Sequence, residues 1–257
     1  MFEFKNKNQK NTPVSVFLFM LISFTSCFFI LPTAGFCENL PKPIIVVNPG
    51  HGGHDLGARG ADGTVEKNIT LALANQIIEN LKPRYQPILT RTGDYFVNIT
   101  ERTSIANYNK ASLFVSIHTS GNYNYQTSGI TISYLDNTAD LSAFSQAPSL
   151  KNRGDGYINI LWDEIHKNQI VKSIEAGKCI QKRLSQNRQF PKNRLLSSPL
   201  RVLSGANMPA VMIEVGYLSN PIEEKNLQNT DYLSELAKEI STGIDDFFMK
   251  AENHINQ

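Results

Sequence analysis

The chain is poor in cysteine, and this limits the kinds of site that it can build. It has 3 cysteines in 257 residues, and two of them, Cys27 and Cys37, lie near the N-terminus. Only Cys179 lies in the remainder, which therefore can form neither an internal disulfide nor a metal site held by several thiolates. Any metal bound there must be held by histidines and carboxylates.

An excess of charge of either sign is also absent. The chain has 25 Lys and Arg against 23 Asp and Glu, but three Lys and one Glu lie in the first 37 residues, so the remainder is formally neutral. A neutral chain offers no electrostatic basis for binding nucleic acid or an anionic membrane surface. We therefore expect no nucleic-acid partner. The 41% hydrophobic and 19% charged residues are typical of one globular domain with a real core.

The first 37 residues differ from the rest. A lysine-bearing start precedes an apolar run without charge at residues 14–31, and the small residues Ala34 and Gly35 follow. This layout is typical of a secretory signal, with a retained membrane anchor as the alternative because the run approaches spanning length. We expect residues 38–257 to form a single exported domain whose contact with the membrane is limited to the leader.

Short strand-like runs alternate with helical patterns after residue 43, as in a domain of the α/β class. The expected strands span residues 44–47, 86–90, 113–117, 129–135 and 210–213. The expected helices span residues 66–81, 100–108, 169–184 and 231–249. Apolar strands that alternate with helices predict a mostly parallel, twisted sheet flanked by helices on both faces. An irregular stretch at about 136–167, rich in Ser, Asn, Asp and Gly, reads as an insertion in this single domain.

Polar side chains follow three of the apolar strands, where a core-building sequence would not place them. His51 lies in the glycine-rich segment NPGHGGH after the first strand, His118 follows LFVSI, and Glu214 follows AVMI. The carboxyl ends of parallel strands meet at one edge of the sheet, where ligands bind. We therefore expect two imidazoles and a carboxylate to meet at that edge.

Glu66 adds a second carboxylate from the first turn of the helix that follows the glycine-rich segment, a position that the helix dipole favours. Two histidines and one glutamate with an open fourth position form a known catalytic zinc set. Asp55 or Asp62 could be the carboxylate ligand instead.

Each of these residues also has a plainer interpretation. His51 could cap a tight turn, His118 could be a hydrogen-bonded core histidine, and Glu66 could be an ordinary helix-terminal charge. Glu214 could form a buried ion pair, with Arg91 or Arg201 as its partner. Spacing alone leaves these alternatives open.

Four segments together resemble the zinc-dependent N-acetylmuramoyl-L-alanine amidases. They are IVVNPGHGGHDLGARGADGTVEKNITLALA, ILTRTGDYFVNITERTSIAN, LFVSIHTS and MPAVMIEVGYLSNPIEE, and they occur in order through most of residues 44–224. The resemblance implies that His51, Glu66 and His118 bind Zn²⁺ and that Glu214 is the catalytic carboxylate. It departs from the usual pattern at Asn48, where the family commonly has Asp, and after His118, where Ala-Asn or Ala-Asp is common.

In that family zinc and the glutamate activate water against the amide bond between N-acetylmuramic acid and the L-alanine of the stem peptide. The resemblance implies a peptidoglycan hydrolase of wall remodelling or cell separation, located in the cell envelope, or in the periplasm if the source has two membranes. We expect a monomer whose partner is peptidoglycan, with a protein activator as a further candidate. Arg91, Glu101 and Arg102 match family positions and are interpreted as anchors of helices and loops. The alternatives are a zinc peptidase acting on the stem peptide and a catalytically silent wall-binding regulator.

The insertion resembles, in position only, the region where some family members carry a helix that blocks the zinc. One hypothesis is that residues 158–167 plug or shape the groove, with Asp163 or Glu164 near the metal. A surface helix packed by Trp162 is the alternative.

Overall fold

The computed structural model of the chain describes residues 41–135 and 162–255. The expected leader and residues 136–161 of the expected insertion lie outside this part, as do the side chains of Asp163 and Glu164, on which the plug hypothesis depends. Across the described segments, no helix combines the length and the apolar character needed to cross a membrane.

A six-stranded sheet forms the centre of the domain, with the strand order β2-β1-β3-β6-β4-β5. β2, β1, β3 and β6 are mutually parallel, whereas β4 runs antiparallel to β6 and parallel to β5. The strands are β1 (Ile44–Pro49), β2 (Gln86–Leu89), β3 (Leu113–Ser120), β4 (Ile130–Tyr134), β5 (Asn193–Ser197) and β6 (Ala210–Tyr217).

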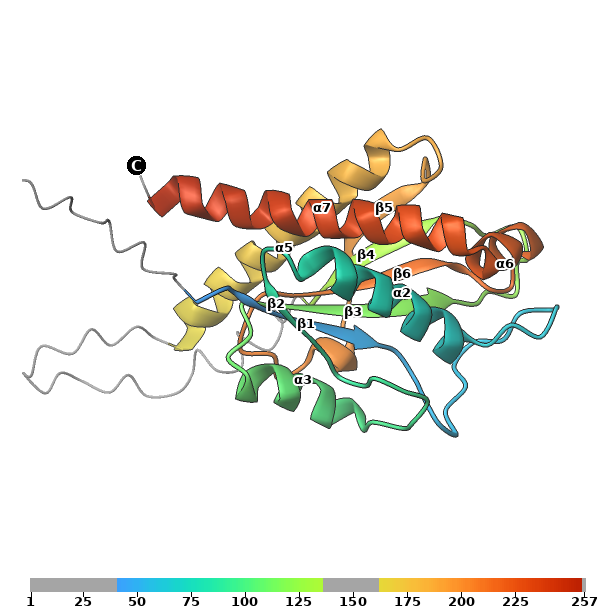
Figure 1. Cartoon of the computed structure of the whole chain (residues 1–257), viewed down its shortest axis with the longest axis horizontal. Coiled ribbons are helices and arrows are strands. Elements are labelled where there is room, and N and C mark those ends of the chain that lie inside the picture. Colours follow the sequence, from blue (N-terminus) through green and yellow to red (C-terminus); the bar gives the residue numbers. More distant parts are fainter. Residues whose placement is uncertain (1–40, 136–161, 256–257) are drawn as a thin grey trace, which may run out of the picture. The chain divides into compact units, whose positions relative to one another are not determined.

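Helices lie on both faces of this sheet, but they cover the faces unequally. On one face α2, α5 and α7 pack side by side, and α3 lies on the other face with the short 3-10 helix η1 (Figure 1). The helices are α2 (Glu66–Leu81), α3 (Ile99–Tyr108), α5 (Trp162–Gln186), η1 (Arg201–Leu203), α6 (Pro221–Gln228) and α7 (Thr230–Ile255).

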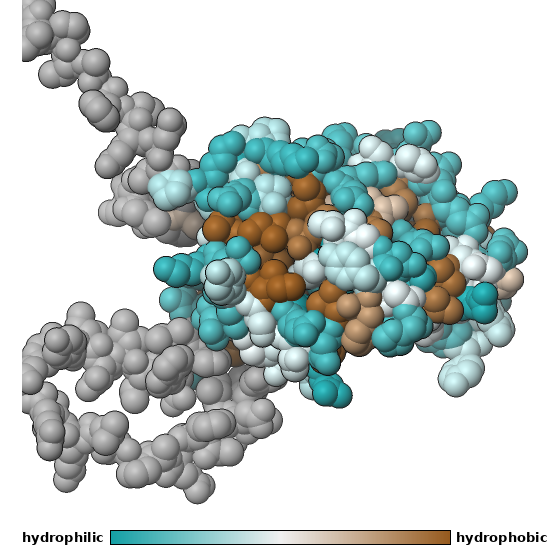
Figure 2. All heavy atoms as spheres, turned by 60° about the horizontal axis from the view of Figure 1, so that its bottom comes forward, coloured by the Kyte–Doolittle hydropathy of each residue, from teal (hydrophilic) through white to brown (hydrophobic). Residues whose placement is uncertain are grey.

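Alternating strand residues build the two cores. Ile45, Val115 and Ile213 belong to the larger cluster beneath α2, α5 and α7, whereas Phe114 and Met212 belong to a smaller cluster beneath α3 and η1. The period of two along each strand produces this division. Figure 2 turns the α3 side forward and shows apolar residues reaching the surface there between hydrophilic side chains.

The expected α/β class and mostly parallel sheet are confirmed, and the differences lie in the second half of the chain. The reversed direction of β4 was not expected, and neither were β5 and α6. The helix expected at residues 169–184 begins earlier, at Trp162, so residues 162–167 are helical. On the parallel strands β1, β3 and β6, the carboxyl ends share one edge, as the sequence predicted.

Close packing of α7 on α5 depends on a glycine, and this gives a stability prediction. A Cβ atom added at Gly243 of α7 would lie 2.5 Å from the Cα atom of Ile180 in α5, and backbone atoms cannot move aside cheaply. We expect Gly243→Ala to lower the free energy of unfolding by about 1–3 kcal/mol. We expect this loss of stability although alanine normally stabilises a helix by about 1 kcal/mol relative to glycine.

Gly177 of α5 provides the matched control, because a Cβ atom there would meet the flexible end of the Leu195 side chain at 2.6 Å. Gly177→Ala should therefore cost clearly less than Gly243→Ala in urea unfolding. Equal or greater stability of the Gly243 variant would contradict this account of the packing.

Candidate active site

The loop that follows β1 brings His51 to the carboxyl edge of the sheet. His51 has φ of 60°, in the left-handed region. Its Nδ1 atom forms a hydrogen bond with Oδ2 of Asp55 at 2.9 Å. Gly57 lies close by with φ of 68°, and a Cβ atom there would approach both the His51 ring and the Glu66 carboxylate to 2.6 Å. Only glycine combines that backbone conformation with that lack of volume.

Two buried arginines hold the backbone of this loop. Arg91 donates to the carbonyl oxygens of Pro49 and Gly50, and Arg102 donates to those of Pro49 and His51. Arg102 also donates to Oδ1 of Asn48 at 2.7 Å. Burial lowers the pKa of Arg102, and the nearby charge of Arg91 lowers it further. Both arginines are therefore anchors of the loop, as the sequence indicated.

Glu101 is a helix anchor in the same sense. It completes a capping box at the start of α3, in which its carboxylate accepts from the backbone N–H of Asn98. Such a box satisfies helix N–H groups that have no partner within the helix.

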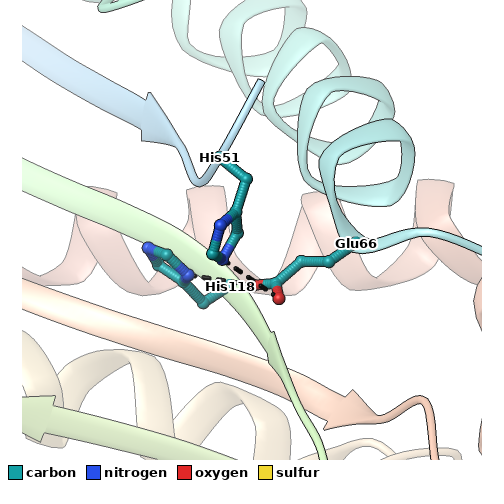
Figure 3. A group of neighbouring side chains, drawn as sticks. All are labelled: His51, Glu66 and His118. Atoms are coloured by element: carbon teal, nitrogen blue, oxygen red, sulfur yellow. Dashed lines mark hydrogen bonds and ion pairs between the residues drawn. The ribbon is translucent and has the colours of Figure 1, made fainter. Parts of the chain in front are cut away.

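Glu66 begins α2 and is 2% exposed. Its Oε1 atom accepts from the backbone N–H of Thr119 at 2.9 Å, and its Oε2 atom accepts from that of Ala58 at 2.8 Å. The same two oxygens lie 2.9 Å from Nδ1 of His118 and 3.1 Å from Nε2 of His51. Both imidazoles thus contact the one carboxylate, as the dashed lines in Figure 3 show.

His118 reaches this group from β3. Its ring packs on Gly50, where an added Cβ atom would lie 2.4 Å from the ring. Its Nε2 atom is buried and has no hydrogen-bond partner among the residues that the structure describes. A buried polar atom without a partner is costly, so this nitrogen has capacity for a ligand from outside the protein.

The electrostatics of the three residues favour a charged carboxylate. Burial by itself would raise the pKa of Glu66, but hydrogen bonds and charge interactions with His118 and His51 outweigh it and hold that pKa well below its usual value. Burial likewise would lower the pKa of His51, but Glu66 and Asp55 together raise it. An ionised Glu66 is the form that can bind a metal.

The donor atoms of His51, Glu66 and His118 fit a metal ion. They lie within 4.8 Å of one another. Donors bound tetrahedrally to zinc at 2.0–2.2 Å stand roughly 3.3–3.6 Å apart, close to the nitrogen–oxygen separations seen here. A proton on Nδ1 of His51, donated to Asp55, leaves Nε2 as a lone pair that faces Glu66.

Glu214 lies beside this group on β6. It is the register partner of His118 on β3 and is half-buried. Burial raises its pKa, and a hydrogen bond with Ser120 and the charge interaction with His118 oppose that rise. The described residues include no ion-pair partner for Glu214, since Arg91 contacts backbone carbonyls and Arg201 is exposed in η1.

The structure thus brings together the four residues that the sequence selected and separates their competitors. Asp55 binds His51 on the side away from Glu66, and Asp62 is exposed. The supporting role of Asp55 was missed at the sequence level, although its place four residues after a histidine in a glycine-rich loop was a signal. The buried network around Asn48 had no such signal.

Two relatives show what the chain is similar to in sequence. N-acetylmuramoyl-L-alanine amidase AmiA of Salmonella typhimurium is 30% identical over 226 residues, which cover 82% of this chain and 78% of the relative. The relative named N-acetylmuramoyl-L-alanine amidase AmiC in Neisseria meningitidis is 29% identical over 228 residues, although these cover 54% of its length.

Solved structures agree with these relatives. AmiC2 of Nostoc punctiforme superposes with a TM-score of 0.65 at 25% identity, covering 80% of this chain and 97% of that one. The catalytic domain of CwlV from Bacillus (Paenibacillus) polymyxa gives 0.62 at 26% identity, covering 80% and 98%. Residues 45–246 match the N-acetylmuramoyl-L-alanine amidase family, and the chain therefore belongs to that family.

Proposed function

We propose that this protein is a zinc-dependent hydrolase that cleaves the amide bond between N-acetylmuramic acid and the L-alanine of the stem peptide in peptidoglycan. The observation that carries the proposal is the contact of the Glu66 carboxylate with both His51 and His118, with Glu214 on the adjacent strand. Membership of the N-acetylmuramoyl-L-alanine amidase family supports the assignment of this amide as the bond that is cleaved.

His51, Glu66 and His118 would hold the zinc ion. The chemistry that zinc supplies at such a site is Lewis-acid polarisation of the scissile carbonyl. Asp55 orients His51 through Nδ1, and the two buried arginines fix the backbone of its loop. These contacts keep the ligands in place before any substrate arrives.

Glu214 would act as the general base and then as the general acid. Its carboxylate takes a proton from the attacking water and later delivers it to the nitrogen of the departing alanine. Burial raises its pKa above the ordinary value of a glutamate, which makes the carboxylate a stronger base for the proton of the water. The half-buried position beside His118 leaves it open to substrate.

The proposal extends to the setting of the reaction. The leader at residues 1–37 would export the chain to the envelope, or to the periplasm of a cell with two membranes, where it would act on peptidoglycan as a monomer. A protein activator would be an additional partner. A silent regulator is disfavoured because neither a ligand nor the glutamate is missing, and a stem-peptide zinc peptidase is the competing activity.

Glu214→Gln tests the general base. We expect wall digestion to fall by about 10²–10⁴-fold while zinc content stays the same, because the amide cannot take up the proton of the water. Mass spectrometry of digested muropeptides gives the measurement: the wild type should release intact peptide from intact glycan, and trimmed peptides would point to the peptidase instead.

Glu175→Gln, on the exposed face of α5, is the matched control and should digest walls like the wild type. Turnover by the Glu214 variant at the wild-type rate would remove this residue from the mechanism.

A second experiment tests the metal. His51→Ala and His118→Ala should each purify with far less zinc than the wild type, because each removes one of three protein ligands. A chelator should abolish wild-type digestion, and added zinc should restore it. Elemental analysis of the purified full chain measures the content directly.

His54→Ala is the control from the same GHGGH segment. His54 is exposed, its ring lies against Phe96 with the centroids 4.4 Å apart, and it does not belong to the group of possible metal ligands around Glu66. This variant should keep its zinc. Full zinc content in the His118 variant would show that the group does not hold the metal.

A further inference from the structure

A row of four register partners crosses the sheet and begins at the proposed active site. His118 on β3 pairs with Glu214 on β6, Glu214 pairs with Thr131 on β4, and Thr131 pairs with Arg194 on β5. Register partners in a sheet present their side chains on the same face. Arg194 therefore stands on the face that bears His118 and Glu214, two strands beyond the glutamate.

The Arg194 guanidinium is held in one orientation. Nε donates to Oγ1 of Thr131 at 3.0 Å, and Nη2 donates to the hydroxyl oxygen of Tyr217 at 3.0 Å. The two acceptor residues are buried, at 3% and 6% exposed, whereas Arg194 itself is exposed. An exposed arginine fixed by two buried side chains is pre-organised, so little further ordering is needed when it binds a ligand.

An irregularity in β6 aims Tyr217 at the arginine. The register of β3 and β6 shifts between His118 and Ser120, and Ser120 then pairs with Tyr217. Gly216, immediately before the tyrosine, has φ of 148°, which side chains with a Cβ atom rarely adopt. Bulges beside active sites commonly redirect a side chain in this way.

No anion compensates the charge of Arg194 within residues 41–135 and 162–255. Arg183, by contrast, makes a bidentate ion pair with Asp246, and Arg84 pairs with Asp245. Arg194 uses neutral hydroxyl acceptors instead. It acts on Glu214 only from a distance: burial raises the pKa of Glu214, and the charge of Arg194 is one of the smaller effects opposing that rise. The guanidinium can therefore receive a carboxylate from a ligand.

The spacing fits a peptide that extends from the scissile bond. Neighbouring strands lie about 4.8 Å apart, so Glu214 and Arg194 are about 10 Å apart at their Cα atoms. An extended peptide advances by about 3.3–3.6 Å per residue. With the scissile amide beside Glu214, a carboxylate on the residue after the alanine comes within reach of the long Arg194 side chain.

We propose that Arg194 binds a carboxylate of the stem peptide, just beyond the alanine, and thereby makes the enzyme selective for substrates with a free acid at that position. This inference rests on the proposed function. Arg194 is a substrate-binding residue, with Thr131 and Tyr217 as its positioning residues.

The test uses two synthetic muramoyl peptides that differ only in whether the carboxylate of the residue after alanine is free or amidated. For the full-length wild type, amidation should raise KM by about 10-fold and leave kcat within about twofold, because a charge-assisted contact is lost at a distance from the reacting bond. Arg194→Gln should raise KM for the acid by about 10-fold and leave KM for the amide unchanged, so the selectivity disappears.

Two further variants separate this role from a structural one. Arg194→Lys should recover part of the selectivity, because it keeps the charge but loses the planar fork. Tyr217→Phe removes one anchor of the guanidinium and should raise KM for the acid alone, by less than Arg194→Gln does. Arg188→Gln removes an exposed cation from the turn before β5 and should leave both substrates unaffected.

The inference is overturned if the wild type cleaves both substrates equally well, if Arg194→Gln keeps the selectivity, or if it lowers kcat equally for both. Failure of the wild type to cut either substrate at the muramoyl–alanine bond would instead remove the proposed function, and this inference with it. Loss of acid selectivity with normal cleavage of the amidated substrate supports it.

Discussion

The buried charge of Glu66 is the constraint around which this end of the molecule is organised. One carboxylate accepts from the backbone N–H groups of Ala58 and Thr119 and faces the rings of His51 and His118. A charge taken out of water is tolerated only when such partners surround it. Because they come from the loop after β1 and from β3, while the carboxylate begins α2, a single side chain fixes three segments relative to one another.

The loop after β1 needs a second set of contacts, since the Glu66 carboxylate contacts it only at His51 and Ala58. Arg91 and Arg102 supply them by donating to consecutive carbonyl oxygens from Pro49 to His51. Asn48 completes the network without any negative charge, accepting from Arg102 and from the Thr90 hydroxyl while donating to Ser116. Backbone oxygens and one side-chain amide oxygen thus accept from the two arginines, and both polar atoms of the Asn48 side chain have a hydrogen-bond partner.

The parallel half of the fold was predictable because hydrophobicity marks its strands, whereas the choice of Glu66 over Asp55 or Asp62 depended on the resemblance to the amidase family. His118 and Glu214 each follow a continuous apolar run, and a buried strand that ends in a polar group indicates a site at the sheet edge. β5 was not predictable, because its residues Asn193 to Ser197 are mostly exposed at the edge of the sheet and show no apolar run. The direction of β4 depends on its pairing with β6, a contact between distant segments that no local pattern encodes.

That reversal of β4 has a chemical consequence. A parallel sheet alone presents only carboxyl ends at its binding edge, and these ends supply His118 and Glu214. Because β4 runs the other way and β5 follows it, Thr131 and Arg194 occupy the second positions of their strands and fall in line with Glu214. The amino ends of β4 and β5 thus extend the row of polar side chains beyond β6, where the parallel strands end. The proposed chemistry lies in the parallel half and the proposed recognition of the stem peptide in the reversed half, so changes in β4 and β5 can alter selectivity without moving a metal ligand.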